Sequence, residues 1–104
     1  MKLYLDDERE APAGWVRVKT ADLAVALLEE NNFEVVSLDH DLGYTSDKHK
    51  TGYDVLCWIE EQVYMKEYPL PEIRIHTANP AARRKMESAV EFLKENSKLL
   101  TTQK

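Results

Sequence analysis

Cysteine, glycine and long apolar stretches are scarce in this chain of 104 residues, and each scarcity excludes a class of protein. Cys57 has no partner for an internal disulfide or for a cysteine-based zinc site, and its helical neighbours predict a buried structural thiol. Gly14, Gly43 and Gly52 are isolated, which removes the glycine-rich phosphate loop of nucleotide-dependent kinases and ATPases. No apolar run approaches the length of a membrane span, so we expect no membrane partner.

Positive charge is also in deficit. The chain has 14 Lys and Arg against 19 Asp and Glu, a formal net charge of -5, which is not typical of a protein that binds duplex nucleic acid in general. The hydrophobic fraction of 43% suffices for one small globular core. A strand-like run begins at Lys2, so we expect no signal peptide and a cytoplasmic location.

Short apolar strands and amphipathic helices follow one another along the chain. Strands are predicted at 2–5, 15–19, 33–38 and 72–76, and helices after the N-cap residues Thr20, Thr51 and Asn79. This order predicts an α/β domain over residues 1–96, with residues 97–104 as a flexible tail. The apolar stripe of the first helix is expected at Leu23, Ala24, Leu27 and Leu28.

The arrangement of the strands can be predicted from their charges. Charged residues and histidine occupy alternate positions of the second and fourth strands, which favours edge positions, so the order counted along the chain is 2-1-3-4. The direction of the second strand stays open. The connection that begins at Glu8 is shorter than a usual parallel crossover, so a hairpin is an alternative.

Acidic residues follow the first and third strands at the edge where ligands bind in open α/β sheets. Asp6, Asp7 and Asp39 would repel one another there unless a hard cation neutralised them. We therefore predict that these three carboxylates hold one Mg²⁺ or Mn²⁺. The simpler alternative is a solvated strand end and a turn-forming aspartate. Asp41 is either a further ligand or an ordinary loop residue.

Two histidines lie in the same loops. His40 and His76 could act as base and acid near neutral pH in the opening of a phosphate ester. Either imidazole could instead be a ligand or a structural group, in which case Asp41, Thr77 or solvent would transfer the protons. His49, in a polar loop, is expected to be solvated.

Phosphate contacts are predicted around the start of the last helix, where N–H groups favour an anion. Thr77 has a hydroxyl suited to a phosphoryl oxygen, and Arg9 is the basic residue nearest to the acids; Asn79 is a candidate that its capping role alone explains. Other basic residues could contribute, and three aromatic residues either stack on a base or pack on the core: Lys48, Lys50, Arg83, Arg84, Trp15, Tyr44 and Tyr53.

These motifs resemble a known family. Asp6-Asp7, Asp39 and Thr77-Ala78 are similar to the acidic pair, phosphoacceptor aspartate and threonine of two-component receiver domains. The chain departs from receivers in lacking a helix between the first two strands and a fifth strand with its lysine. With Leu38-Asp39-His40-Asp41-Leu42-Gly43 and His76-Thr77-Ala78-Asn79-Pro80, it resembles the receiver-derived cyclic-phosphate processing domains.

The resemblance implies a fold and a function. The expected fold is a small, truncated, flavodoxin-like three-layer sandwich with a four-stranded, mainly parallel sheet. The expected function is a metal-dependent phosphoesterase that hydrolyses a cyclic phosphate on a small phosphorylated ligand, a nucleotide or an RNA end. The alternative is a receiver-like signalling or protein-interaction module without hydrolytic activity. The oligomeric state is left open.

Overall fold

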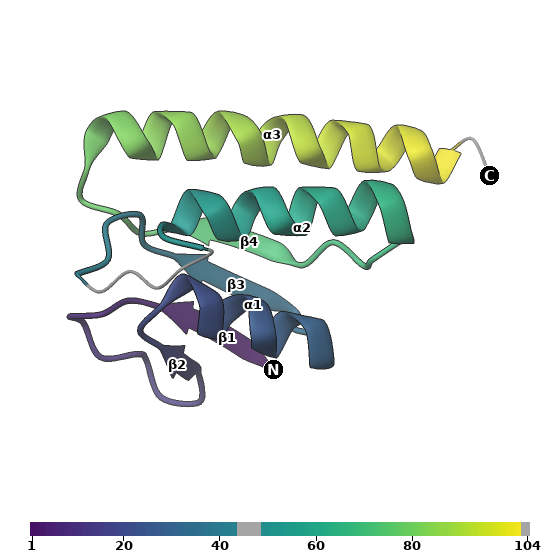
Figure 1. Cartoon of the computed structure of the whole chain (residues 1–104). Coiled ribbons are helices and arrows are strands. Elements are labelled where there is room, and N and C mark those ends of the chain that lie inside the picture. The colour runs from purple at the N-terminus through teal and green to yellow at the C-terminus, as the bar shows by residue number, and fades with distance from the viewer. Residues whose placement is uncertain (44–48, 103–104) are drawn as a thin grey trace.

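The computed structural model describes residues 1–43 and 49–102, with side chains up to residue 97. Tyr44 and Lys48, two of the residues considered above, lie outside the described part of the chain. Strands and helices follow the predicted order (Figure 1): β1 Lys2–Leu5, β2 Val16–Val18, α1 Ala21–Glu30, β3 Val35–Leu38, α2 Gly52–Lys66, β4 Glu72–Ile75 and α3 Pro80–Thr102. Helix α3 thus continues past Asn96, where we expected the ordered domain to end.

The strands form one parallel sheet in the order β2-β1-β3-β4, as predicted. Strand β2 is parallel to β1, which settles the direction that the sequence left open. No helix forms in this connection: residues 6–15 make bends and a turn, in which Trp15 N–H donates to Pro12 C=O at 3.2 Å. Asp6 N–H then donates to Val18 C=O at 3.0 Å and extends the ladder.

Each helix begins at the predicted cap. The hydroxyl of Thr20 accepts the N–H of Leu23, and Thr51 and Asp54 form a reciprocal capping box at the start of α2. Asn79 Oδ1 accepts the N–H of Ala82 at 3.1 Å at the start of α3. These bonds satisfy N–H groups that have no partner within the helix, so they fix where each helix starts relative to the sheet.

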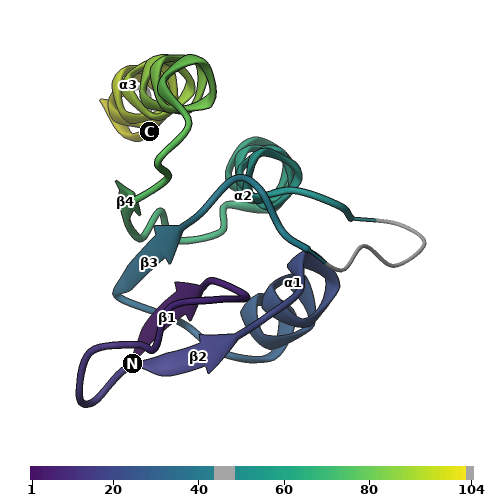
Figure 2. The same ribbon diagram turned by 90° about the vertical axis from the view of Figure 1, so that its left-hand side faces the viewer.

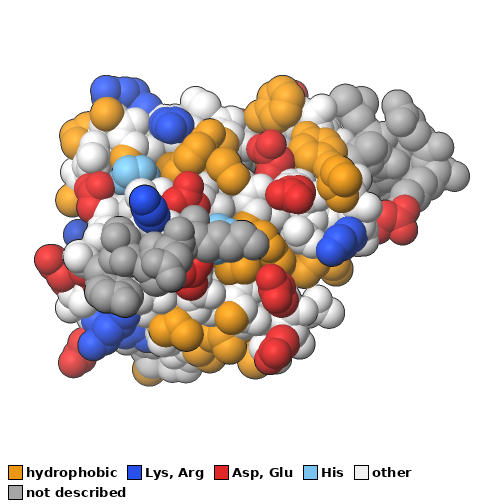
Figure 3. Space-filling view, viewed as in Figure 1, with side chains coloured by type: hydrophobic (Ala, Val, Ile, Leu, Met, Phe, Trp, Pro, Cys, Tyr) orange, Lys and Arg blue, Asp and Glu red, His pale blue; other side chains and the backbone are white. Residues whose placement is uncertain are grey.

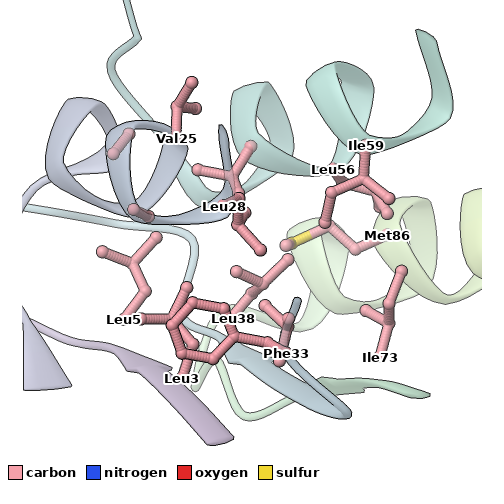
Figure 4. Packing of buried hydrophobic residues seen from close by; sticks show 14 of the residues in the cluster. Leu3, Leu5, Val25, Leu28, Phe33, Leu38, Leu56, Ile59, Ile73 and Met86 are labelled. Atoms are coloured by element: carbon pink, nitrogen blue, oxygen red, sulfur yellow. The ribbon is translucent and has the colours of Figure 1, made fainter. Parts of the chain in front are cut away.

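The hydrophobic core lies between the sheet and the three helices (Figure 4). Leu3 and Leu5 of β1 and Leu38 of β3 meet Leu28 of α1 and Met86 of α3. The predicted stripe of α1 needs one correction, because Leu23 is 53% exposed. The buried face of α1 is instead Ala21, Ala24, Val25 and Leu28.

Helices α1 and α2 lie over one side of the sheet, and α3 lies next to α2 past the β4 edge (Figure 2). Of the described segments, the β1–β2 loop reaches the other side. Helix α2 packs against both α1 and α3, while the side carrying Lys2, Tyr4 and Ser37 has no helix over it. The fold is therefore α/β and flavodoxin-like in topology, but it has two layers where we expected three. The reason is the handedness of crossovers: β2-α1-β3 and β3-α2-β4 both advance in one direction across the sheet, which places their helices on the same side.

The helix side carries acidic groups among basic and apolar ones (Figure 3). Cys57 belongs to this side and is exposed, which corrects the prediction of a buried thiol. His49 is not a solvated residue either, because its side chain is only 16% exposed and its Nδ1 lies 2.8 Å from Asp22 Oδ1. Within the described residues, no helix has both the length and the apolar character required to cross a membrane.

Candidate metal and acid–base site

Three of the predicted residues lie side by side where the strands end. Tyr4, Ser37 and Arg74 are register partners across β1, β3 and β4, and Asp6, Asp39 and His76 each stand two residues further along those strands. Side chains alternate along a strand, so residues two apart point to the same side. Ligand atoms of Asp6, Asp39 and His76 accordingly lie within 4.8 Å of one another.

Asp6 is the most buried member of this group, with 1% of its surface exposed. Its Oδ1 accepts the N–H groups of Glu8 at 2.8 Å and Arg9 at 2.9 Å, and its Oδ2 accepts His76 Nε2 at 3.1 Å. Burial acts to raise the pKa of the Asp6 carboxyl, but these hydrogen bonds outweigh it and lower the pKa below the ordinary value. Asp6 is therefore an ionised carboxylate held in a fixed orientation.

His76 has a partner for each ring nitrogen. Its Nε2 lies 3.1 Å from Asp6 Oδ2 and its Nδ1 lies 2.7 Å from Ser37 Oγ. Burial lowers the pKa of His76 against the opposing effect of Asp39 and Asp6, which favours a neutral ring. A neutral ring that donates through Nε2 accepts the Ser37 hydroxyl through Nδ1, and a ring that binds a cation through Nε2 can donate to the same hydroxyl.

His40 forms a second pair with Asp41. Its Nδ1 lies 2.8 Å from Asp41 Oδ1, and this bond is the main reason that the pKa of Asp41 is lowered. Because an ionised carboxylate only accepts, Nδ1 carries the proton and Nε2 is the basic nitrogen. Asn79 Nδ2 donates to Asp41 Oδ2 at 3.4 Å, so the cap of α3 also orients this pair.

Asp7 is not brought into the group of Asp6, Asp39 and His76. It follows the row of Leu3 and Leu5, whose side chains point to the helix side, and its Oδ2 accepts the N–H of Gly43 at 2.6 Å. This contact ties the loop after β1 to the loop after β3. The sequence predicted that Asp7 is a metal ligand. In the structure its carboxylate instead joins the two loops on the helix side of the sheet.

Of the three residues predicted to contact phosphate, Arg9 lies at the site, and Thr77 and Asn79 form hydrogen bonds in the turn before α3. Arg9 Nη1 donates to His76 C=O at 2.8 Å and lies 3.9 Å from Asp6 Oδ2, with its side chain 52% exposed. Thr77 is buried, and its hydroxyl accepts the N–H of Asn79 at 3.2 Å. Arg9 can therefore reach an anion beside the acids, while Thr77 and Asn79 shape the turn before α3.

Gly52 permits the close packing that positions Asp39. Its N–H donates to His40 C=O at 3.2 Å, and a Cβ at this position would lie 1.7 Å from the carbonyl oxygen of Asp39. No side chain fits there. The start of α2 is thereby pressed against the backbone of the loop that carries Asp39 and His40.

The group of Asp6, Asp39 and His76 is suited to a divalent cation by its chemistry. Two carboxylates and one imidazole combine hard oxygen ligands with a nitrogen, a set that Mn²⁺ accepts more readily than Mg²⁺. Asp39 Oδ1 accepts the N–H of His40 at 2.8 Å, and among the described residues no donor engages its Oδ2. The residues that sequence reasoning missed are Ser37 and Tyr4. The polar Ser37 within an otherwise apolar strand was the available signal.

The fold and this site define a receiver-type α/β domain with an acidic strand-end site and two histidines. The chain belongs to the cyclic-phosphate processing receiver domain family, whose model matches residues 1–92. Comparison with curated proteins gives no match, and comparison with solved structures gives none either. The matched range ends within α3 and includes every residue of the site described above.

Proposed function

We propose that this protein is a metal-dependent phosphoesterase that hydrolyses a cyclic phosphate on a nucleotide or an RNA end. The observation that carries the proposal is the row of Asp6, Asp39 and His76, followed directly by His40 held through Nδ1 by Asp41. Asp6, Asp39 and His76 are suited to holding a cation, and the pair of His40 and Asp41 is suited to transferring a proton. A receiver that only accepts a phosphoryl group requires no such histidine pair.

Asp6, Asp39 and His76 would hold the cation. When bound, it would stabilise the charge that develops on the non-bridging oxygens of the phosphate. The half-exposed guanidinium of Arg9, next to Asp6, would bind the same phosphate as a charged donor. Ser37 would keep the ring of His76 in place through Nδ1.

His40 is the proposed general base or acid. Asp41 fixes its tautomer and orientation through Nδ1, which leaves Nε2 to take a proton from water or to return one to the departing sugar oxygen. His76 was predicted as the second acid–base group. Both of its nitrogens have protein partners and its ligand atom lies within 4.8 Å of those of Asp6 and Asp39, which favours the role of ligand, so the second proton transfer is assigned to solvent in this proposal.

The test is a product assay with 2′,3′- and 3′,5′-cyclic nucleotides and cyclic-phosphate RNA ends, each with Mg²⁺, Mn²⁺ or a chelator. We expect turnover that requires the cation and is lost in Asp39→Asn, together with metal binding by calorimetry. Glu10→Gln is the matched control, since it also converts a carboxylate to an amide, on an exposed residue of the neighbouring loop. Equal metal binding in Asp39→Asn and wild type would refute the site, and chelator-resistant turnover would refute the metal.

The two histidines are separated by a second comparison. His40→Ala should retain metal affinity and lose roughly 10²-fold in turnover, because only the proton transfer is removed. His76→Ala should lose metal affinity. If His40→Ala retained near-wild-type turnover with the fold intact by circular dichroism, the assignment of His40 would be wrong.

A further inference from the structure

The side of the sheet opposite the helices carries a set of basic and aromatic residues that the proposed chemistry does not use. We name this surface the open sheet face and define it by Lys2, Tyr4, Trp15, Arg17 and Arg74. Tyr4, Arg17 and Arg74 lie in one register row with Ser37 across the sheet. Trp15 precedes β2 and lies against Tyr4, with ring centroids 6.0 Å apart and planes at 84°.

The register rows of this face hold three basic side chains, Lys2, Arg17 and Arg74, and one acidic one, Glu72, although the chain as a whole is acidic. Lys2 Nζ lies 5.7 Å and Arg74 Cζ 5.8 Å from the centroid of the Trp15 ring. Arg17 Nε donates to Asp6 C=O at 3.2 Å. Glu72 is paired with Arg74, whose side chain is 55% exposed. Two long, flexible cations thus flank an indole, and a third reaches the loop of the candidate site.

The open sheet face is continuous with the candidate site. The ring of Tyr4 stacks on the ring of His76, with centroids 4.4 Å apart and planes at 3°. Trp15 therefore lies one aromatic ring away from a member of the proposed metal group. If the phosphate of a ligand reached Asp6, Asp39 and His76, the part of the ligand next to that phosphate would pass over Tyr4 towards Trp15.

We infer that the open sheet face binds the single-stranded RNA segment that leads to a terminal cyclic phosphate in the site. The inference rests on the proposed function. Sheet faces with partly exposed aromatic and basic side chains suit single strands, because bases stack on the rings while cations contact the backbone phosphates. Stacking on Trp15 would displace Lys2 and Arg74 from its ring towards those phosphates.

Charge and shape favour a strand over other occupants. A mononucleotide would fill the site and leave three cations without a phosphate, whereas a duplex would not expose bases to Trp15. No helix of the described chain lies over this side of the sheet (Figure 2). Val35 and Ser37 of β3 are buried there, whereas Tyr4 and Trp15 are partly exposed and Arg74 is exposed, so a strand would contact these three side chains and not the floor of the sheet.

The experiment measures binding without turnover. A fluorescein-labelled RNA of about eight nucleotides, ending in a 3′-phosphate that offers no ring to open, is titrated with the protein in Mn²⁺ and followed by anisotropy. Trp15→Ala and Arg74→Glu should each weaken binding about tenfold. Arg74→Glu should also flatten the dependence of affinity on salt. Tyr64→Ala and Lys66→Glu, exposed residues on the helix side, are the matched controls, and circular dichroism checks each fold.

The outcomes separate this inference from the proposed function. If the variants behave as expected but no cyclic phosphate is opened, the proposed chemistry fails and the RNA surface stands. If a cyclic mononucleotide is opened but Arg74→Glu and Lys66→Glu bind RNA equally, the surface is refuted. Wild-type affinity in Trp15→Ala, or equal binding of the matching duplex or of a glutamate-rich peptide, would also overturn the single-strand assignment.

Discussion

Replacing Gly52 by alanine should damage the candidate site more than any other glycine substitution in the described chain. An added Cβ would lie 1.7 Å from the carbonyl oxygen of Asp39 and 2.8 Å from its carbonyl carbon. Both are backbone atoms, so the contact can be relieved only by moving the loop away from α2. The loop would have to shift by more than an ångström, and Asp39 would move with it.

The magnitude follows from two opposing effects. Alanine within a helix is favoured over glycine by about 1 kcal/mol, and Gly52 is the first residue of α2. Overpacking costs about 1–3 kcal/mol, and the upper end or more applies because backbone must give way. The net loss in the free energy of unfolding is about 2 kcal/mol, or a fall in Tm of roughly 8–16 °C for a domain of this size.

The assay pairs urea unfolding with calorimetric Mn²⁺ titration and compares three variants. Gly14→Ala is the matched control: nothing lies within 4 Å of its added Cβ, and its φ of 86° makes the cost one of backbone strain, about 1 kcal/mol. In Gly43→Ala the Cβ meets Asp7 Oδ2 at 2.6 Å, the movable end of a side chain. Gly52→Ala alone should lose metal affinity at least about tenfold. Equal metal affinity in Gly52→Ala and Gly14→Ala would refute the role of this packing.

Three further predictions concern single residues. Hydrogen bonds from Lys50 and Thr51 N–H outweigh burial and lower the pKa of Asp54, so its stabilisation is present above its ordinary pKa of 3.8 and lost as the pH falls through the lowered value. Asp54→Ala should thus cost about 1 kcal/mol at pH 7 and progressively less in acid, and a constant difference down to the acid transition by urea unfolding would contradict this. Although part of the Cys57 residue is exposed, desolvation of its thiol by the neighbouring atoms and the charges of Glu60 and Asp54 raise its pKa. Alkylation by iodoacetamide at pH 8 should therefore be slower in the folded than in the urea-unfolded protein, and equal rates by mass spectrometry would argue against it. Acetyl phosphate with Mg²⁺ should leave no lasting mass increase at Asp39, because the described sheet has no fifth strand to supply a stabilising lysine; a stable adduct lost in Asp39→Asn would favour the signalling alternative.

The strand order could be predicted because the edge strands carry charge at alternate positions, as Arg17 and Arg74 do. The direction of β2 could not, because a short connection is compatible with a hairpin or with a parallel return, and the hydrogen bonds that decide between them involve Pro12 and Val18. Two layers are what right-handed crossovers predict when no helix connects β1 to β2. The sequence already showed the missing helix, but the resemblance to complete receivers led us to expect a third layer.

The candidate site was predictable in its residues and only partly in its geometry. The sequence indicated that Asp6, Asp39 and His76 share one edge of the sheet, but it did not separate Asp6 from Asp7. Alternation along β1 makes that distinction once Leu3 and Leu5 are known to face the core. The pairing of His76 with Ser37 and of His40 with Asp41 depends on the register between strands and on loop conformation, which no spacing in the sequence specifies.

The same alternation connects the site with the open sheet face. Residues of β1, β3 and β4 that do not face the core form rows that run out of the sheet into Asp6, Asp39 and His76. A helix packed over those rows, as a three-layer fold would have, would bury Tyr4 and separate Trp15 from the site. The short β1–β2 connection puts no helix over the rows and supplies Trp15, which packs on Tyr4 and lies near Arg74. On this reasoning the feature that distinguishes the chain from a complete receiver is also the one that would give a polymeric substrate access to its strand-end site.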